Sequence, residues 1–180
     1  MIERLGREGR ASMVKPWVDV WCAASDAGGA IDFDGPADPA AVAALVDAEL
    51  SDPRTEILVA RDAGEDVGGD LGGDLGRPVG FVVLRRNTAV VMQHWAWLQR
   101  LMVHPDQQGR GLGGRLVLAS HEVARTSGLS QLRLTARSGH GLDRFYGRLG
   151  FRVIGSHPRA VALADGTFRD EITMLIDLDS

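Results

Sequence analysis

The sequence predicts an α/β or α+β fold with a mixed sheet, in a single domain that spans residues 1–180. Three observations lead to this prediction. The 180 residues suffice for one sizeable core, and the 44% apolar and 24% charged fractions are those of an ordinary globular chain. Apolar segments with the two-residue period of strands alternate with segments of helical spacing. The order is two strands, then a strand–loop–helix–strand–helix unit, then two more strands, which indicates a mixed sheet.

We expect residues 1–12 to be a loosely ordered N-terminal segment and two helices to follow it. The first helix starts at Pro16, in "PWVDVWCAAS", where apolar residues recur at a spacing of three to four. The second begins after Asp38, whose side chain suits the N-cap, with Pro39 at the first helical position. Asp52 followed by proline ends this helix.

The next segments are strands. "TEILVARD" (55–62) and "PVGFVVLRR" (78–86) are joined by a glycine-rich segment, 64–77, in which "GGDL" occurs twice, and we expect a hairpin loop there. "WAWLQRLMV" (95–103) is the third strand. Unbroken alternation along it places five side chains on one side: Trp95, Trp97, Gln99, Leu101 and Val103.

The second half of the chain continues the alternation. The segment "GRLVLASHEVARTSG" has the apolar spacing of a helix and stops at Gly128. "LSQLRLTA" reads as a strand, and "GLDRFYGRLG" as a short helix that stops at Gly150. Residues 151–178 contain two final strands.

The stretch "VHPDQQGRGLGGRL" contains the candidate ligand-binding loop. Its glycines match both the G-x-G-x-x-G of dinucleotide sites and the Q-x-x-G-x-G of acyl-CoA loops. A dinucleotide site requires an acidic residue at the end of the next strand, but that strand ends in Thr135, Ala136 and Arg137. A nucleoside-triphosphate loop requires Gly-Lys-Ser or Gly-Lys-Thr, which does not follow. What remains is an anion site made by backbone N–H groups at the start of a helix.

Composition excludes several classes of protein. No apolar run approaches the roughly 20 residues that span a bilayer, and the N-terminus has no signal-peptide core, so we expect a cytoplasmic protein without a membrane partner. The net charge of −4 argues against nucleic acid as a partner. A lone cysteine, Cys22, excludes a disulfide framework and a cysteine-based metal cluster, and no metal is expected.

Two segments carry a family resemblance. "LQRLMVHPDQQGRGLGGRLV" and, about 30 residues later, "GLDRFYGRLGF" resemble the acetyl-CoA-binding core of the GNAT superfamily of N-acetyltransferases. Within it the pattern is most similar to the tabtoxin resistance protein group, through "LMVHP", "GRGLG", "SGHG" and the tail "GFRVIGSHPRAVALADGTFRDE". The resemblance covers the chain from about Ala27 to its end.

The resemblance implies a central, mostly antiparallel mixed sheet flanked by helices and splayed at the acyl-CoA site, with acetyl-CoA as cosubstrate. A bulge in the strand that ends "LMV" would open the splay. Backbone groups of Leu101, Met102 and Val103 would bind pantetheine and polarise the acetyl carbonyl. The pyrophosphate would be bound by the loop residues Gln108, Gly109, Arg110, Gly111, Leu112, Gly113 and Gly114.

Tyr146 occupies the family position of the general acid that protonates the departing thiolate. The alternative for Tyr146 is a core aromatic, at helical spacing from Leu142 and Leu149. The resemblance places the acceptor pocket at Trp97 and "GGAIDFDG" (28–35), with Thr135 as a second substrate-binding residue.

The sequence departs from the family where a base is needed. Many members carry a glutamate on the strand before "LMV", and here the equivalent position is Trp97. Proton removal from the amine must therefore use a water chain or another residue, with His94 and Asp34 as candidates and His104 as a weaker one.

The resulting hypothesis is an enzyme that transfers acetyl from acetyl-CoA to an amine of a small-molecule acceptor in a direct ternary complex. Two alternatives stay open. One is a catalytically silent acyl-CoA-binding regulatory module, and the other is a protein N-terminal acetyltransferase. The resemblance also leaves a homodimer open, because dimers are common among the relatives.

Overall fold

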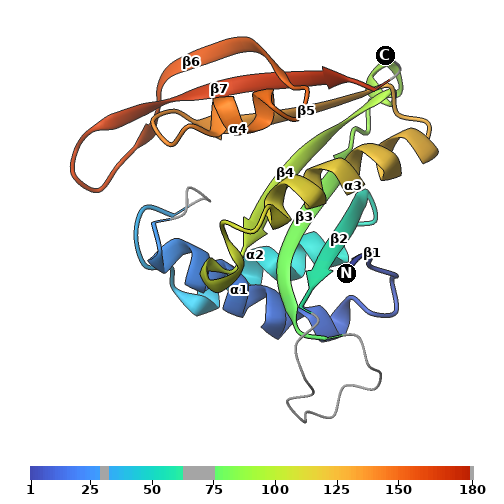
Figure 1. Cartoon of the computed structure of the whole chain (residues 1–180), viewed down its shortest axis with the longest axis horizontal. Helices are drawn as coiled ribbons and strands as arrows, with labels where there is room; N and C mark the ends of the chain where they lie inside the picture. The colour runs from blue at the N-terminus through green and yellow to red at the C-terminus, as the bar shows by residue number, and fades with distance from the viewer. Residues whose placement is uncertain (29–32, 63–75, 179–180) are drawn as a thin grey trace.

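The computed structural model describes residues 1–28, 33–62 and 76–178, and its sheet lies between two layers of helices (Figure 1). The strands are β1 (Ile2–Arg4), β2 (Thr55–Arg61), β3 (Pro78–Arg86), β4 (Trp95–Val103), β5 (Gln131–Arg137), β6 (Arg152–Ala162) and β7 (Phe168–Asp177). The helices are α1 (Val14–Asp26), α2 (Pro39–Ser51), α3 (Leu112–Thr126) and α4 (Leu142–Gly147). The strand order is β1-β2-β3-β4-β5-β7-β6. Among these strands β4 and β5 are parallel neighbours and the other pairs are antiparallel, which confirms the predicted mixed sheet.

The helix boundaries follow local signals in the sequence. The Asp38 carboxylate accepts a hydrogen bond from the N–H of Ala40 at 3.1 Å, and Pro39 opens α2 as predicted. Helix α3 ends before Gly128, whose φ of 75° continues no helix. Helix α1 begins at Val14, two residues before the predicted start, so its proline lies in the first turn. None of the helices in the described ranges is long and apolar enough to cross a bilayer.

The expectation of a loose N-terminal segment is wrong for its first residues. Ile2–Arg4 form the edge strand β1, in register with Leu58, Val59 and Ala60 of β2. The Arg61 Nε donates to Glu3 Oε1 at 2.6 Å and fixes the two strands to each other. A strand of three residues shows no period in the sequence, so pairing with a distant strand decides its structure.

Two apolar cores hold the layers together. Helices α1 and α2 pack on one face of the sheet, where Trp17 stacks on Phe81 with ring centroids 4.8 Å apart. Helices α3 and α4 pack on the other face, around Leu116 and Tyr146. Each strand of the sheet centre therefore contributes alternate side chains to the two cores.

Strand β4 departs from unbroken alternation. Its register with β3 passes from Val83↔Gln99 to Phe81↔Met102, so β4 contains one more residue than its partner over this stretch. Arg100 lies in this bulge with a φ of 56°, in the left-handed region that few non-glycine residues adopt. The prediction that Trp95, Trp97, Gln99, Leu101 and Val103 share one side is therefore wrong beyond the bulge, where Leu101 and Val103 pack with the core on the α3 side.

The predicted hairpin loop between β2 and β3 lies outside the described residues, apart from Gly76 and Arg77. At its ends the Asp62 N–H donates to the Arg77 carbonyl at 2.9 Å, so the two strands still meet where the described residues stop.

Candidate active site

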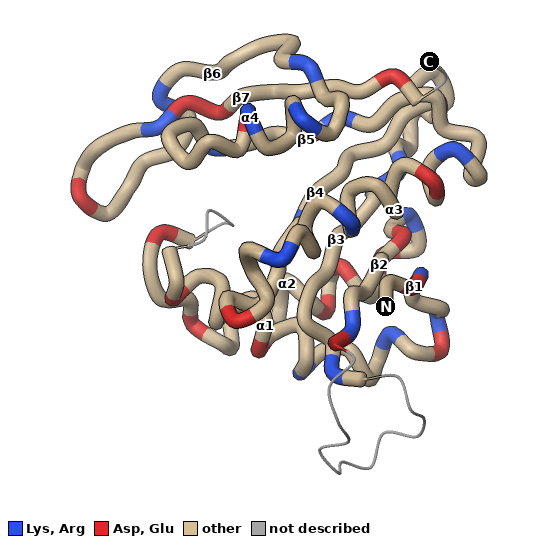
Figure 2. Tube along the Cα trace, viewed as in Figure 1, with Lys and Arg blue, Asp and Glu red and all other residues tan. Residues whose placement is uncertain are grey.

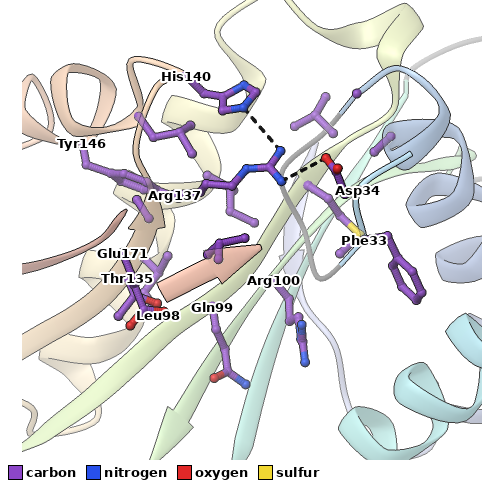
Figure 3. Close-up of a pocket in the computed structure, with 18 of the residues that line it drawn as sticks. Phe33, Asp34, Leu98, Gln99, Arg100, Thr135, Arg137, His140, Tyr146 and Glu171 are labelled. Carbon is purple, nitrogen blue, oxygen red and sulfur yellow. Dashed lines mark hydrogen bonds and ion pairs between the residues drawn. The ribbon is translucent and has the colours of Figure 1, made fainter. Parts of the chain in front are cut away.

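The bulge has its main consequence on the opposite edge of β4. Pairing between β4 and β5 ends at Trp97↔Arg133, although both strands continue. Beyond that point residues 98–103 of β4 and 135–137 of β5 line a cavity of about 640 Å³ (Figure 3). The parallel pair is therefore splayed, as the family resemblance implied, and the gap between its strands is the floor of the cavity.

A buried carboxylate on α2 forms hydrogen bonds with side chains at the bulge. Glu49 of α2 is 3% exposed, and its Oε1 accepts hydrogen bonds from Gln99 Nε2 and Arg100 Nε, both at 3.3 Å. Its other oxygen accepts from Arg85 Nη2 at 2.5 Å. Burial raises the pKa of Glu49, and the neighbouring Arg85 opposes the rise. The Arg100 guanidinium also lies 5.0 Å above the Trp21 ring, so α1 and α2 both fix the side chain of the bulge residue.

The register of β4 decides which backbone groups face the gap. The N–H of His104 donates to the Val79 carbonyl at 2.8 Å, and Met102 is in register with Phe81. Because hydrogen-bonded positions alternate along an antiparallel pair, the backbone groups of Met102 also point to β3, and those of Leu101 and Val103 point to the gap. Of the three residues expected to bind pantetheine by their backbones, Leu101 and Val103 thus have their N–H groups directed at the gap, and Met102 has its N–H group directed at β3.

The predicted anion loop leads from β4 into α3. Gly109 and Gly111 have φ angles of 72° and 74°, and no atom lies within 4 Å of the position that a Cβ would take at either. The Gln108 N–H donates to the Pro105 carbonyl, and the next amide along the chain with a carbonyl partner is that of Arg115, which donates to Gly111. Within the described residues no acceptor binds the N–H groups of 109–114. These six donors at a helix N-terminus fit a diphosphate.

Side chains fix the shape of this loop. Gln108 Nε2 donates to the Val103 carbonyl at 2.9 Å, which ties the loop to the end of β4. Arg115 Nη1 donates to the Arg110 carbonyl at 3.2 Å. Leu112 is buried in the core on the α3 side. A Cβ on Gly113 or Gly114 would make only an ordinary van der Waals contact with Phe145 or Leu149, so the first turn of α3 lies beside α4 and the residues that follow it.

Tyr146 belongs to the core and to the cavity at once. Its ring packs edge-on against Phe145 and Phe151, with centroids 4.9 and 5.7 Å away. The residue also lines the cavity, and no described group bonds to its hydroxyl. Burial raises the pKa of the phenol above its usual value, so it is protonated at neutral pH.

The other side of the gap is polar. Trp97 and Thr135 line it as expected, and Phe33 and Asp34 from the connection between α1 and α2 do so as well. Figure 3 shows Arg137 reaching from the end of β5 across the cavity, with dashed contacts to Asp34 and His140. The sequence analysis did not assign Arg100, Arg137, His140 and Glu171 to the site, although all four line the cavity.

Of the three candidate bases, only Asp34 lies at the cavity. His94 is exposed and lies just before β4. His104 lies in the turn that follows β4, where its Nδ1 accepts a hydrogen bond from the Asp106 N–H at 3.3 Å. The described part of the chain contains no group of three or more His, Cys, Asp or Glu side chains placed to hold a metal ion.

Comparison with known proteins gives a family and a fold. The family model described as the acetyltransferase (GNAT) family matches residues 31–151. A putative acetyltransferase from Salmonella typhimurium, solved with its cofactor acetyl-CoA, is 20% identical with a TM-score of 0.72, over 100% of this chain and 94% of that one. A putative phosphinothricin N-acetyltransferase is 13% identical with a TM-score of 0.78, over 100% and 99% of the two chains. A ribosomal-protein-alanine N-acetyltransferase from Brucella melitensis is 17% identical with a TM-score of 0.72, over 98% and 99%.

The loop can be tested at Gly111. Any side chain there adopts a left-handed conformation and costs about 1–2 kcal/mol of stability, but the added atoms enter open space. We expect Gly111→Glu to weaken acetyl-CoA binding by about 10- to 100-fold more than Gly111→Gln, because only the former puts a negative charge where the diphosphate binds. Isothermal titration measures the affinities, and urea unfolding checks that the two variants are equally stable. Equal affinities in the two variants would show that the loop is only a turn.

Proposed function

This chain belongs to the GNAT family of acetyltransferases, which use acetyl-CoA as cosubstrate, and from that premise we propose that it transfers the acetyl group to the amine of a small-molecule acceptor. The observation that carries the proposal is a cavity in the gap between β4 and β5 that Tyr146 also lines, together with a loop that starts at this cavity. Gln108 lines the cavity, and the amide donors of 109–114, which have no acceptor among the described residues, follow it along the chain.

Each of these features has a role in the proposed reaction. The amides of 109–114 bind the diphosphate, and the backbone groups of Leu101 and Val103 bind the pantetheine arm as an added strand would. Transfer forms one C–N bond and breaks one C–S bond, while the amine loses a proton and the thiolate gains one. We propose that Tyr146 donates the proton that the thiolate gains. Tyr146 is protonated at neutral pH because burial raises its pKa. The amine proton leaves on the polar side, where Asp34, His140 and Glu171 line the cavity.

The composition of the cavity favours direct transfer in a ternary complex. No cysteine is among the described residues that line it, and Cys22 lies elsewhere on α1. A covalent acyl-enzyme would require a nucleophile beside the thioester, activated by a base. The hydroxyls at the cavity are those of Tyr146 and Thr135, and neither has a partner that could activate it among the described residues.

The cavity and the charge distribution also bear on the alternatives. Figure 2 shows acidic and basic residues interspersed along the described elements, without the basic stripe that a polyanion requires. A silent acyl-CoA-binding module and a protein N-terminal acetyltransferase remain alternatives, since neither the loop nor the gap distinguishes them from a small-molecule enzyme. Membership in the tabtoxin resistance group, a homodimer and a cytoplasmic location stay predictions.

A thiol-release assay separates the three functions. With acetyl-CoA as donor, we expect free thiol to appear in the presence of small amines and intersecting initial-rate lines when both substrates are varied. Turnover confined to peptides with free N-termini would favour the protein N-terminal acetyltransferase. Micromolar binding of acetyl-CoA with no turnover on either panel would favour the silent module and refute an enzyme.

The role of Tyr146 can be tested with Tyr146→Phe, which keeps the ring and its contacts with Phe145 and Phe151. If the hydroxyl protonates the thiolate, kcat should fall by about 100-fold or less, the low end of what one general acid contributes. The small effect is expected because a phenol of raised pKa is a weak acid. The affinity for acetyl-CoA and the melting temperature should barely change.

Tyr146→Ala is the matched packing control. It removes the ring from the core and should cost about 3–5 kcal/mol of stability, whatever the hydroxyl does. A wild-type kcat with an unaltered pH profile in Tyr146→Phe would instead leave Tyr146 as a core residue and make solvent the source of the proton.

A further inference from the structure

Arg137 is a buried cation on the acceptor side of the cavity. Its side chain is 10% exposed, and it lies at the end of β5, next to the gap. Side chains alternate along a strand, so Arg137 and Thr135 share the face opposite Leu134 and Ala136, which pack in the core with Tyr146. The guanidinium therefore faces the acceptor, and the phenol lies on the other face of the sheet.

The guanidinium has too few acceptors for its five N–H groups. Within the described ranges Nε has no hydrogen-bond partner, although it is buried. Nη2 lies 3.3 Å from Nε2 of the exposed His140. Nη1 forms an ion pair with Asp34 Oδ1 at 3.5 Å, which is too long to be a good hydrogen bond. A buried guanidinium with too few acceptors is costly, and at a ligand cavity such a group indicates an anionic ligand group.

Asp34 is a weak partner for Arg137. Its side chain is 36% exposed, and its other oxygen, Oδ2, already accepts a hydrogen bond of 2.7 Å from the Ala164 N–H in the turn between β6 and β7. The ion pair therefore joins two elements across the cavity by one long contact, as Figure 3 shows. A carboxylate that approached Arg137 in a bidentate geometry would make the stronger interaction.

We propose that the acceptor is an amine that also carries a carboxylate, and that it inserts between Arg137 and Asp34. The carboxylate of the acceptor binds the guanidinium, including its unpartnered Nε, and the ammonium group faces Asp34. Arg137 and Asp34 thus lose their long contact with each other, and each gains a shorter contact with the acceptor. This inference rests on the proposed function, because it names the substrate class of the same site.

The spacing along β5 limits the distance between the two groups of the acceptor. Thr135 lies beside the splayed part of β4, and Arg137 is two residues further along, or about 7 Å. A carboxylate held at Arg137 therefore leaves room for an amine a few bonds away at the thioester. An acceptor with positive charge alone would separate Asp34 from the guanidinium and leave it with the neighbouring Glu171 of β7, which forms no ion pair with it in the described structure, so the site selects against it.

The test is substrate selectivity in matched pairs. The probes are glycine, β-alanine and 4-aminobutyrate, L-phenylalanine and L-glutamate, each paired with its carboxamide, which keeps the amine and removes the charge. We expect the better carboxylates to exceed their carboxamides in kcat/KM by about 10- to 100-fold, the range of a charge-assisted hydrogen bond. Arg137→Gln should abolish this preference, because kcat/KM should fall far more on each carboxylate than on its carboxamide, and Arg137→Lys should restore part of it.

Arg133→Gln is the control, because Arg133 lies on the same face of β5 but stacks on Trp95, 4.1 Å from the ring, outside the cavity. It should keep the wild-type preference. Titration of the same probes into the complex with CoA provides a second readout that needs no turnover. Equal use or binding of the two members of every pair by the wild type would overturn the inference, as would a preference that survives Arg137→Gln or no binding of any probe. Loss of acetyl-CoA binding itself would refute the proposed function instead.

Discussion

The site depends on one extra residue in β4. An antiparallel pair in perfect register would keep β4 straight and paired with β5 along its whole length, and no gap would form. The bulge at Arg100 turns the strand, so the pairing with β5 ends at Trp97. A left-handed conformation at a non-glycine residue costs about 1–2 kcal/mol. Glu49 and Trp21, which hold the Arg100 side chain from two different helices, stabilise the bulge against that cost.

A second arginine with a positive φ lies at another register shift of the sheet. Arg159 of β6 also has a φ of 56°, at a register shift between β6 and β7. Its guanidinium stacks on Phe168 at 3.9 Å, and its N–H donates to the Asp170 carboxylate at 2.9 Å. Beyond this irregularity Val161 and its neighbour reach the cavity. Two irregularities, each with an arginine stacked on an aromatic ring, thus occur in strands on the two sides of the gap between β4 and β5.

The features that the sequence could predict are those set by a few consecutive residues. Asp38 caps α2, Gly128 ends α3, and the glycines of 109–114 open the helix N-terminus, because each acts on backbone atoms within about a turn. The residues of "WAWLQRLMV" fit a straight strand equally well, so the bulge was expected only from the family resemblance. The ion pair between Asp34 and Arg137 could not be predicted, because it joins the connection between α1 and α2 to the end of β5, about a hundred residues further along the chain.

Amide hydrogen exchange at single-residue resolution tests the central claim that acetyl-CoA binds in the gap opened by the bulge. Acetyl-CoA should slow the exchange of the amides of Leu101 and Val103, which face the gap, and those of 109–114 at the start of α3. The amide of Met102, already paired with β3, should change little. Protection of 109–114 without protection of Leu101 and Val103 would mean that the loop binds an anion but the gap does not hold pantetheine, and would contradict the account.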